Sequence, residues 1–155
     1  MDEAAFDQQN ERDWAVRLLV YQFFVENERP PTTGEAAVAL GIAFEQACEA
    51  YESLHRRHAL FLEPGTLDVR MANPFSARPT SFRVHVGARA YYANCAWDML
   101  GIPAALHADA RIEAIYTDTG EAAYLTVSNG QLRRDDALVS FALPFRHWYD
   151  DLIFT

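Results

Sequence analysis

The segment YYANCAWDML, residues 91–100, places a thiol and a carboxyl group three residues apart in an otherwise apolar and aromatic stretch. Asn94 is a good helix N-cap, so we expect Cys95 to begin a helix and Asp98 to lie on the same face one turn later. The helix dipole should then lower the pKa of the Cys95 thiol and favour the thiolate. A thiolate binds soft metals, and a carboxyl group in a dry pocket can hold and deliver a proton. The pair therefore suits a reaction that captures a soft centre and protonates a group bound to it.

A plainer interpretation fits the same spacing. Cys95 could be a core residue, because free cysteines are commonly small buried hydrophobes. Asp98 would then be an ordinary surface acid, since a buried charge is costly without a partner. The spacing alone leaves both interpretations open.

The first part of the chain has helical periodicity. We expect a helix over residues 14–27, whose apolar stripe contains Val16, Leu19, Val20 and Phe23. Thr33 can cap a second helix that ends at Gly41, and the third helix lies within residues 43–60. Residues 61–71 then predict a strand, a Pro-Gly turn and a second strand. Three helices followed by a hairpin are typical of a winged helix-turn-helix.

After about residue 80 the pattern changes to short strands with turn signals. Strands are expected over 81–86, 110–116, 121–127 and 137–144, with a strong hairpin signal in Ser-Asn-Gly at 128–130. The predicted fold class is α+β, with an N-terminal winged-helix-like helical module packed on a mostly antiparallel sheet domain that bears the Cys-x-x-Asp helix. We place the helical module at residues 1–72 and the sheet domain at residues 73–155.

The charge balance weighs against several classes of partner. The 155 residues contain 22 acidic and 13 basic side chains, a net charge of −9. An acidic surface repels phosphate backbones and anionic lipid, so we expect no nucleic acid and no membrane partner. The winged-helix outline suggests a third hypothesis, a DNA-binding regulator. However, residues 1–80 carry 13 acidic and 7 basic residues, and the expected recognition helix, FEQACEAYESLHRR, offers no basic face.

The two cysteines and the acidic N-terminal segment indicate where in the cell the protein is expected. No signal-peptide pattern, no membrane-length apolar run and no zinc-type Cys/His cluster is present in the sequence. A cytoplasmic protein with reduced thiols is expected. The oligomeric state is left open.

The other candidate groups are less informative. Cys48 falls on the apolar stripe of the third helix and is expected in the core. The five histidines show no pair at metal-ligand spacing on one helix face. Asp150 and Asp151 are expected to be a solvated pair.

The longer stretch RVHVGARAYYANCAWDMLGIPAAL, residues 83–106, resembles the catalytic segment of the alkylmercury (organomercurial) lyase family. In that family, a strand and hairpin lead into an aromatic-rich helix start, then Cys-Ala-x-Asp and a Pro-Ala pair. The likeness extends from about residue 14 to 155, through RPPTTGEAAVALGI, ARIEAIYTDTGEAAYLTVSNG and LVSFALP. It implies a structural role for the helix-turn-helix segment.

The resemblance implies roles for the pair. Cys95 corresponds to the catalytic, mercury-binding cysteine, and Asp98 to the catalytic aspartate beside the metal. The implied reaction is protonolysis of a carbon–mercury bond in a small organomercurial, which releases hydrocarbon and Hg(II). No organic cofactor is implied, since mercury is bound as part of the substrate or product. External small thiols are the expected acceptors of the metal.

The resemblance also implies a second catalytic cysteine, in a C-terminal segment of the type Phe-Cys-x-x-x-x-Phe-Phe. The sequence given reads HWYDDLIFT at that place, and Thr155 lies about where the cysteine is expected next. Either the sequence is interrupted there or this homologue lacks the residue. A non-catalytic protein that binds or senses a soft metal or organometal through Cys95 is therefore the alternative to a lyase.

Overall fold

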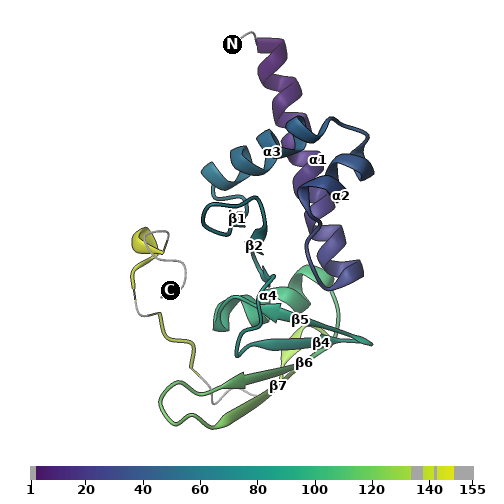
Figure 1. Ribbon diagram of the computed structural model, residues 1–155. Helices are drawn as coiled ribbons and strands as arrows, with labels where there is room; N and C mark the ends of the chain where they lie inside the picture. The colour runs from purple at the N-terminus through teal and green to yellow at the C-terminus, as the bar shows by residue number, and fades with distance from the viewer. Residues whose placement is uncertain (1–2, 134–137, 142, 149–155) are drawn as a thin grey trace.

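Three helices precede the sheet in the computed structural model, which describes residues 3–133, 138–141 and 143–148 (Figure 1). They are α1 (Glu3–Asn27), α2 (Thr33–Leu40) and α3 (Phe44–Arg56). Thr32, not Thr33, caps α2, because Thr32 and Glu35 form a reciprocal capping box. Gly41 ends α2 as predicted, in a left-handed conformation with φ of 63°. Within the described residues, no helix combines the length and the apolar character needed to cross a membrane.

The buried stripe of α1 differs from the predicted one at its end. Val16, Val20 and Phe24 are buried, whereas Phe23 lies beneath the Arg29 guanidinium, 5.5 Å from it. Phe24 takes the inner position because its ring stacks on Phe75 of the sheet, with ring centroids 5.3 Å apart. Which residues of α1 are buried is therefore determined partly by Phe75, a contact that is distant in sequence.

An eight-stranded antiparallel sheet follows the helices, in the order β1-β2-β3-β5-β4-β6-β7-β8. The predicted hairpin of residues 61–71 is present as β1 and β2. The short strand β3 was not predicted; it pairs with both β2 and β5, so the sheet continues across the expected boundary at residue 72. The division into two domains stays a prediction, while the α+β class is confirmed. The strands are β1 (Phe61–Leu62), β2 (Val69–Ala72), β3 (Phe75–Ser76), β4 (Arg83–Val86), β5 (Arg89–Ala93), β6 (Ala110–Ile115), β7 (Ala122–Ser128) and β8 (Gln131–Leu132).

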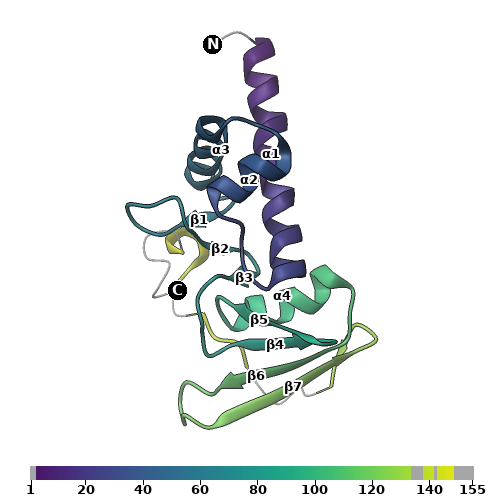
Figure 2. The same cartoon turned by 45° about the vertical axis from the view of Figure 1, so that its right-hand side comes forward.

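Alternation along the strands builds the core under the site. Val84, Ile112 and Leu125 are direct cross-strand neighbours on β4, β6 and β7, and all three are buried. The predicted hairpin at residues 128–130 joins β7 to β8, with Asn129 and Gly130 both at positive φ. Helix α4 (Ala96–Leu106) contacts β4, β5 and β6. In both views it lies against the sheet beside the C-terminal end of α1 (Figure 1, Figure 2).

The strand predicted over 137–144 is wrong for its described residues. Residues 138–141, 143 and 144 have no strand conformation, and 137 and 142 lie outside the described residues. Leu138 is 94% exposed, while Phe141 packs against Trp97 of α4 instead of joining the sheet. A short 3-10 helix, η1 (Phe145–His147), follows.

A polar cluster fixes α1 against α3. The Asp13 carboxylate is buried and accepts hydrogen bonds from the Ser53 hydroxyl at 2.6 Å and the Arg57 guanidinium at 2.8 Å. Ser53 is also buried, so it has no ready access to water as a substitute partner. Loss of the carboxylate would leave a buried hydroxyl unpaired.

We expect Asp13→Ala to lower the free energy of unfolding by about 2–3 kcal/mol, because removing one partner of a buried polar pair strands the other. Glu11→Ala, on an exposed position of the same helix, is the matched control and should stay within about 0.5 kcal/mol of wild type. Urea unfolding followed by circular dichroism measures both. Equal effects of the two substitutions would show that the Asp13 cluster contributes no particular stability.

Candidate active site

The end of β5 is held in place just before Cys95. Ala93 is fully buried, and its N–H donates to the Phe82 carbonyl at 2.9 Å. The Ala93 carbonyl accepts a hydrogen bond from the Thr80 hydroxyl at 2.6 Å. These bonds fix the backbone two residues before the thiol, so the position of Cys95 is set by the sheet. Sequence reasoning missed Thr80, which carries no local signal for this role.

Cys95 itself is the N-cap of α4, one residue earlier in the helix than predicted. Asn94 precedes the cap, and the helix begins at Ala96. Cys95 has an extended backbone, with φ −147° and ψ 178°, and its carbonyl accepts the first helical hydrogen bond from Met99 N–H at 3.1 Å. Its side chain makes no capping hydrogen bond. The thiol is therefore available to other partners.

Asp98 is buried, with only 8% of the residue exposed, on the core side of the first turn of α4. Burial raises the pKa of its carboxyl group from 3.8 to about 6, and a hydrogen bond from the Cys95 thiol opposes the rise. A rise of this size corresponds to about 3 kcal/mol. The dipole at a helix start favours a carboxylate by only about 0.3–1 kcal/mol, so desolvation dominates.

The predicted decrease in the pKa of Cys95 is wrong. Burial raises the pKa of the thiol, and the negative charge of Asp98 raises it further. The backbone N–H groups of Asp98 and Trp97 face the sulfur and oppose these effects, but do not outweigh them. At neutral pH the pair is therefore a neutral thiol close to a carboxylate, and the plainer interpretation of Asp98 as a surface acid is wrong.

A model of the alkylmercury lyase family, MerB, matches residues 75–153 of this sequence, which is just over half of the chain. The chain belongs to the alkylmercury lyase family. The resemblance seen in the sequence is thereby confirmed, and the matched segment contains β3 to β8, α4 and the Cys95–Asp98 pair.

A solved structure supports the same relationship. The crystal structure of the mercury-bound form of MerB2 matches with a TM-score of 0.64 and 27% sequence identity. The match covers 80% of this chain and 59% of that chain, so this chain spans less than two thirds of the MerB2 length. No curated protein matches this sequence at the threshold applied.

The second cysteine lies apart from the pair. Cys48 is on α3, which contacts α1, α2 and β1, and in both views α3 lies away from α4 (Figure 1, Figure 2). Cys48 is only partly buried, so the expectation of a core residue is not met. Burial and the charges of Glu45 and Glu52 raise the pKa of its thiol. Cys48 thus lies on the partly exposed side of α3 and does not provide a second thiol next to Cys95.

No classical metal cluster accompanies the pair. In the described part of the chain, no group of three or more His, Cys, Asp or Glu side chains is placed to hold a metal ion. Among the histidines, His85 pairs with Glu113 at 3.0 Å and His58 stacks on Phe61. Asp150 and Asp151 lie outside the described residues. Any soft metal at this site would therefore meet one thiol and one carboxyl group first.

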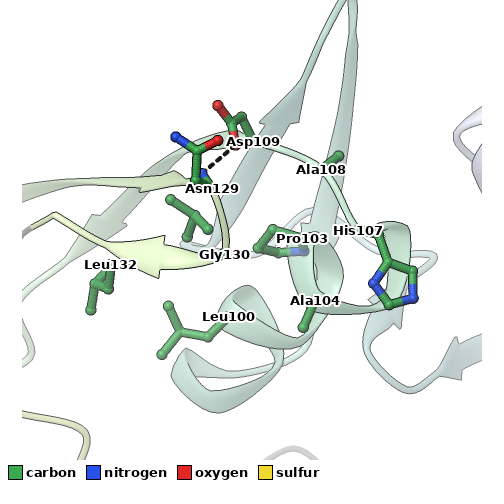
Figure 3. A pocket seen from close by; sticks show the side chains of 10 residues that line it. Leu100, Pro103, Ala104, His107, Ala108, Asp109, Asn129, Gly130 and Leu132 are labelled. Carbon is green, nitrogen blue, oxygen red and sulfur yellow. Dashed lines mark hydrogen bonds between the residues drawn. The ribbon is translucent and has the colours of Figure 1, made fainter.

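A separate hollow of about 630 Å³ lies beside the C-terminal half of α4 (Figure 3). At its rim, Asp109 accepts a hydrogen bond from the Asn129 N–H at 2.7 Å, which ties β6 to the β7–β8 hairpin. Cys95 and Asp98 are not among the described residues that line it, so the hollow is distinct from the Cys95–Asp98 pair. Its lining residues are Leu100, Pro103, Ala104, His107, Ala108, Asp109, Val127, Asn129, Gly130 and Leu132.

The raised pKa of Asp98 gives a stability prediction with a defined sign. The folded protein binds this proton more tightly than the unfolded chain, so the carboxyl group contributes stability below about pH 4 that is lost as the pH rises through about 6. Asp98→Asn keeps the shape without the charge. Relative to this variant, wild type should lose about 2–3 kcal/mol of unfolding free energy between about pH 4 and pH 8.

Urea unfolding of both proteins across that pH range measures the difference. Asp118→Asn, in the exposed turn between β6 and β7, controls for the loss of a surface carboxylate. A wild-type–Asp98→Asn difference that does not change with pH would show that Asp98 is not held in a desolvated position.

Proposed function

We propose that this chain is an organomercurial lyase that cleaves a carbon–mercury bond by protonolysis. The observation that carries the proposal is the buried Asp98 carboxyl group, which lies in the first turn of α4, whose N-cap is Cys95, and whose pKa burial raises to about 6. A general acid works best when its pKa lies near the working pH. Membership of the alkylmercury lyase family supports the same reaction.

In the first step, the mercury of R–Hg–X forms a bond to Cys95 Sγ while X leaves as an anion. A metal-bound thiol loses its proton, which overcomes the raised pKa of the free thiol. Asp98 lies in the first helical turn after Cys95 and its pKa is raised to about 6, so its carboxylate receives the proton. The product of this step is Cys95 S–Hg–R beside a protonated Asp98.

In the second step, Asp98 gives the proton to the carbon bonded to mercury. The electron pair of the carbon–mercury bond becomes the new carbon–hydrogen bond, and R–H leaves. Hg(II) stays on Cys95 with one uncompensated positive charge, which the regenerated Asp98 carboxylate faces. No oxidant or reductant is needed, because mercury is Hg(II) throughout.

The partners follow from this chemistry. The substrate is a small organomercurial, and external small thiols remove the Hg(II), since soft ligands compete best for a soft ion. No organic cofactor takes part in either step. A cytoplasmic location, where small thiols are reduced and abundant, belongs to the same proposal.

One observation favours the alternative of a non-catalytic binding or sensing protein. Cys48 lies on α3, away from the pair, so a mercury ion on Cys95 meets a single thiol among the described residues. A thiolate and a carboxylate are a poorer ligand set for a soft ion than two thiolates. Such a protein would hold the organomercurial on Cys95 without cleaving it.

The two functions are separated by Asp98→Asn in a Cys48→Ser background, where Cys95 is the remaining thiol. We expect the variant to bind phenylmercury one-to-one, as wild type does, while benzene release falls by a factor of about 10² or more, the usual scale for losing a general acid. Cys95→Ser should lose both binding and release. Mass spectrometry of the adduct and gas chromatography of benzene, with excess small thiol present, measure the two quantities.

A parent protein that binds phenylmercury on Cys95 but releases no benzene would favour the binding protein. Equal losses of binding and release in Asp98→Asn would make Asp98 a plain ligand or a structural residue instead of a proton carrier.

A further inference from the structure

Three aromatic rings from two distant segments form a continuous row beside the start of α4. The Trp97 and Phe141 ring centroids are 6.0 Å apart, and Phe141 stacks on Trp148 at 5.1 Å. The indole N–H of Trp148 donates to the Leu143 carbonyl at 3.0 Å, which fixes this ring to its own segment. We call Trp97, Phe141 and Trp148 the aromatic row.

The aromatic row is exposed to an unusual degree for large rings. Trp97 is 58% exposed and Phe141 is 49% exposed, whereas the core ring of Phe75 is 2% exposed. The two exposed rings, Trp97 and Phe141, therefore gain little hydrophobic stabilisation from their position. Neighbouring exposed aromatic rings are typical of surfaces that bind an apolar group.

The aromatic row begins in the helical turn that carries Cys95 and Asp98. Trp97 lies between Cys95 and Asp98 in the sequence, and its backbone N–H is one of the two that face the Cys95 sulfur. In a mercurial bound to Cys95, the first carbon is two bonds from that sulfur. The organic group therefore starts close to the first turn of α4, where Trp97 is an exposed large apolar side chain.

We propose that the aromatic row stacks against the organic group of the substrate and makes arylmercurials better substrates than short alkylmercurials. The inference rests on the proposed lyase function and names the substrate class of the same site. A phenyl group gains an aromatic contact with Trp97 and Phe141 in addition to area burial, whereas a methyl group is too small to span a ring. Both substrates use the same Cys95 and Asp98 chemistry.

The test compares kcat/KM for phenylmercury and methylmercury in wild type, Trp97→Leu and Phe141→Leu. One aromatic contact corresponds to a selectivity factor of about three- to tenfold. We expect each substitution to reduce the phenyl-to-methyl ratio by about that factor, mainly by slowing the phenyl reaction. Trp14→Leu is the matched control: this ring is 54% exposed on α1, so its loss should leave the ratio unchanged.

A phenyl-to-methyl ratio of kcat/KM that stays constant in Trp97→Leu and Phe141→Leu would overturn the proposal. Equal losses of kcat/KM for the two substrates give the same constant ratio and would mean that the rings only support the fold or the Cys95–Asp98 pair. Thermal unfolding of each variant shows whether it remains folded. If wild type releases no hydrocarbon from either compound, the lyase function fails, and the ratio is measured as binding instead. Competition for each mercurial against a small thiol should then show about the same three- to tenfold change in the phenyl-to-methyl affinity ratio. An unchanged affinity ratio would overturn the proposal that the aromatic row binds the organic group.

Discussion

The site depends on a carboxyl group that is held out of water against a thiol. Asp98 sits in the first turn of α4 on the side that faces the core, where its ionised form is disfavoured strongly enough to raise its pKa to about 6. A carboxylate at an exposed helix start would have remained ionised and solvated. Because Cys95 is the N-cap of the same helical turn, the proton that mercury displaces has a nearby acceptor, and the desolvation of Asp98 becomes part of the proposed chemistry.

Keeping Asp98 in this position requires that α4 cannot rotate or slide. Ile102, one turn further along the same side, is fully buried. At Gly101 the Pro74 ring comes so close that an added Cβ would lie 3.1 Å from Pro74 Cβ, so an alanine there would have to displace the ring by a few tenths of an ångström. The N-terminal helices contribute through the hydrogen bond from the Tyr91 hydroxyl to the Val25 carbonyl, at 2.9 Å. The helical part thus supports the sheet that holds Cys95.

The sequence predicted well what local patterns determine. Alternation identified β4, β6 and β7, and the Ser-Asn-Gly signal identified the β7–β8 hairpin, because side-chain period and turn residues act locally. The pair itself was found from its residue types and spacing. Two residues next to the pair's surroundings, Thr80 on Ala93 and Phe141 on Trp97, could not be found in this way, because each acts through a contact with a distant segment.

The direction of the Cys95 pKa shift also could not be predicted from local sequence. The helix start predicted a lower pKa, and the N–H groups of Trp97 and Asp98 do favour the thiolate. Burial and the neighbouring carboxylate outweigh them, and both depend on tertiary packing that spacing does not reveal. Likewise, the strand predicted over 137–144 had a suitable local pattern, yet Phe141 packs on Trp97 instead.

The central claim is that burial makes the Asp98 carboxylate basic enough to take up the proton that Cys95 loses, and a carbon-13 NMR titration of its side-chain carboxyl group tests this most directly. The resonance is assigned by its loss in Asp98→Asn. The account predicts a titration midpoint at about pH 6. A midpoint close to the ordinary value of 3.8 would contradict it, because the carboxylate would then be an ordinary solvated one, too weak a base to take the thiol proton and hold it for transfer to carbon.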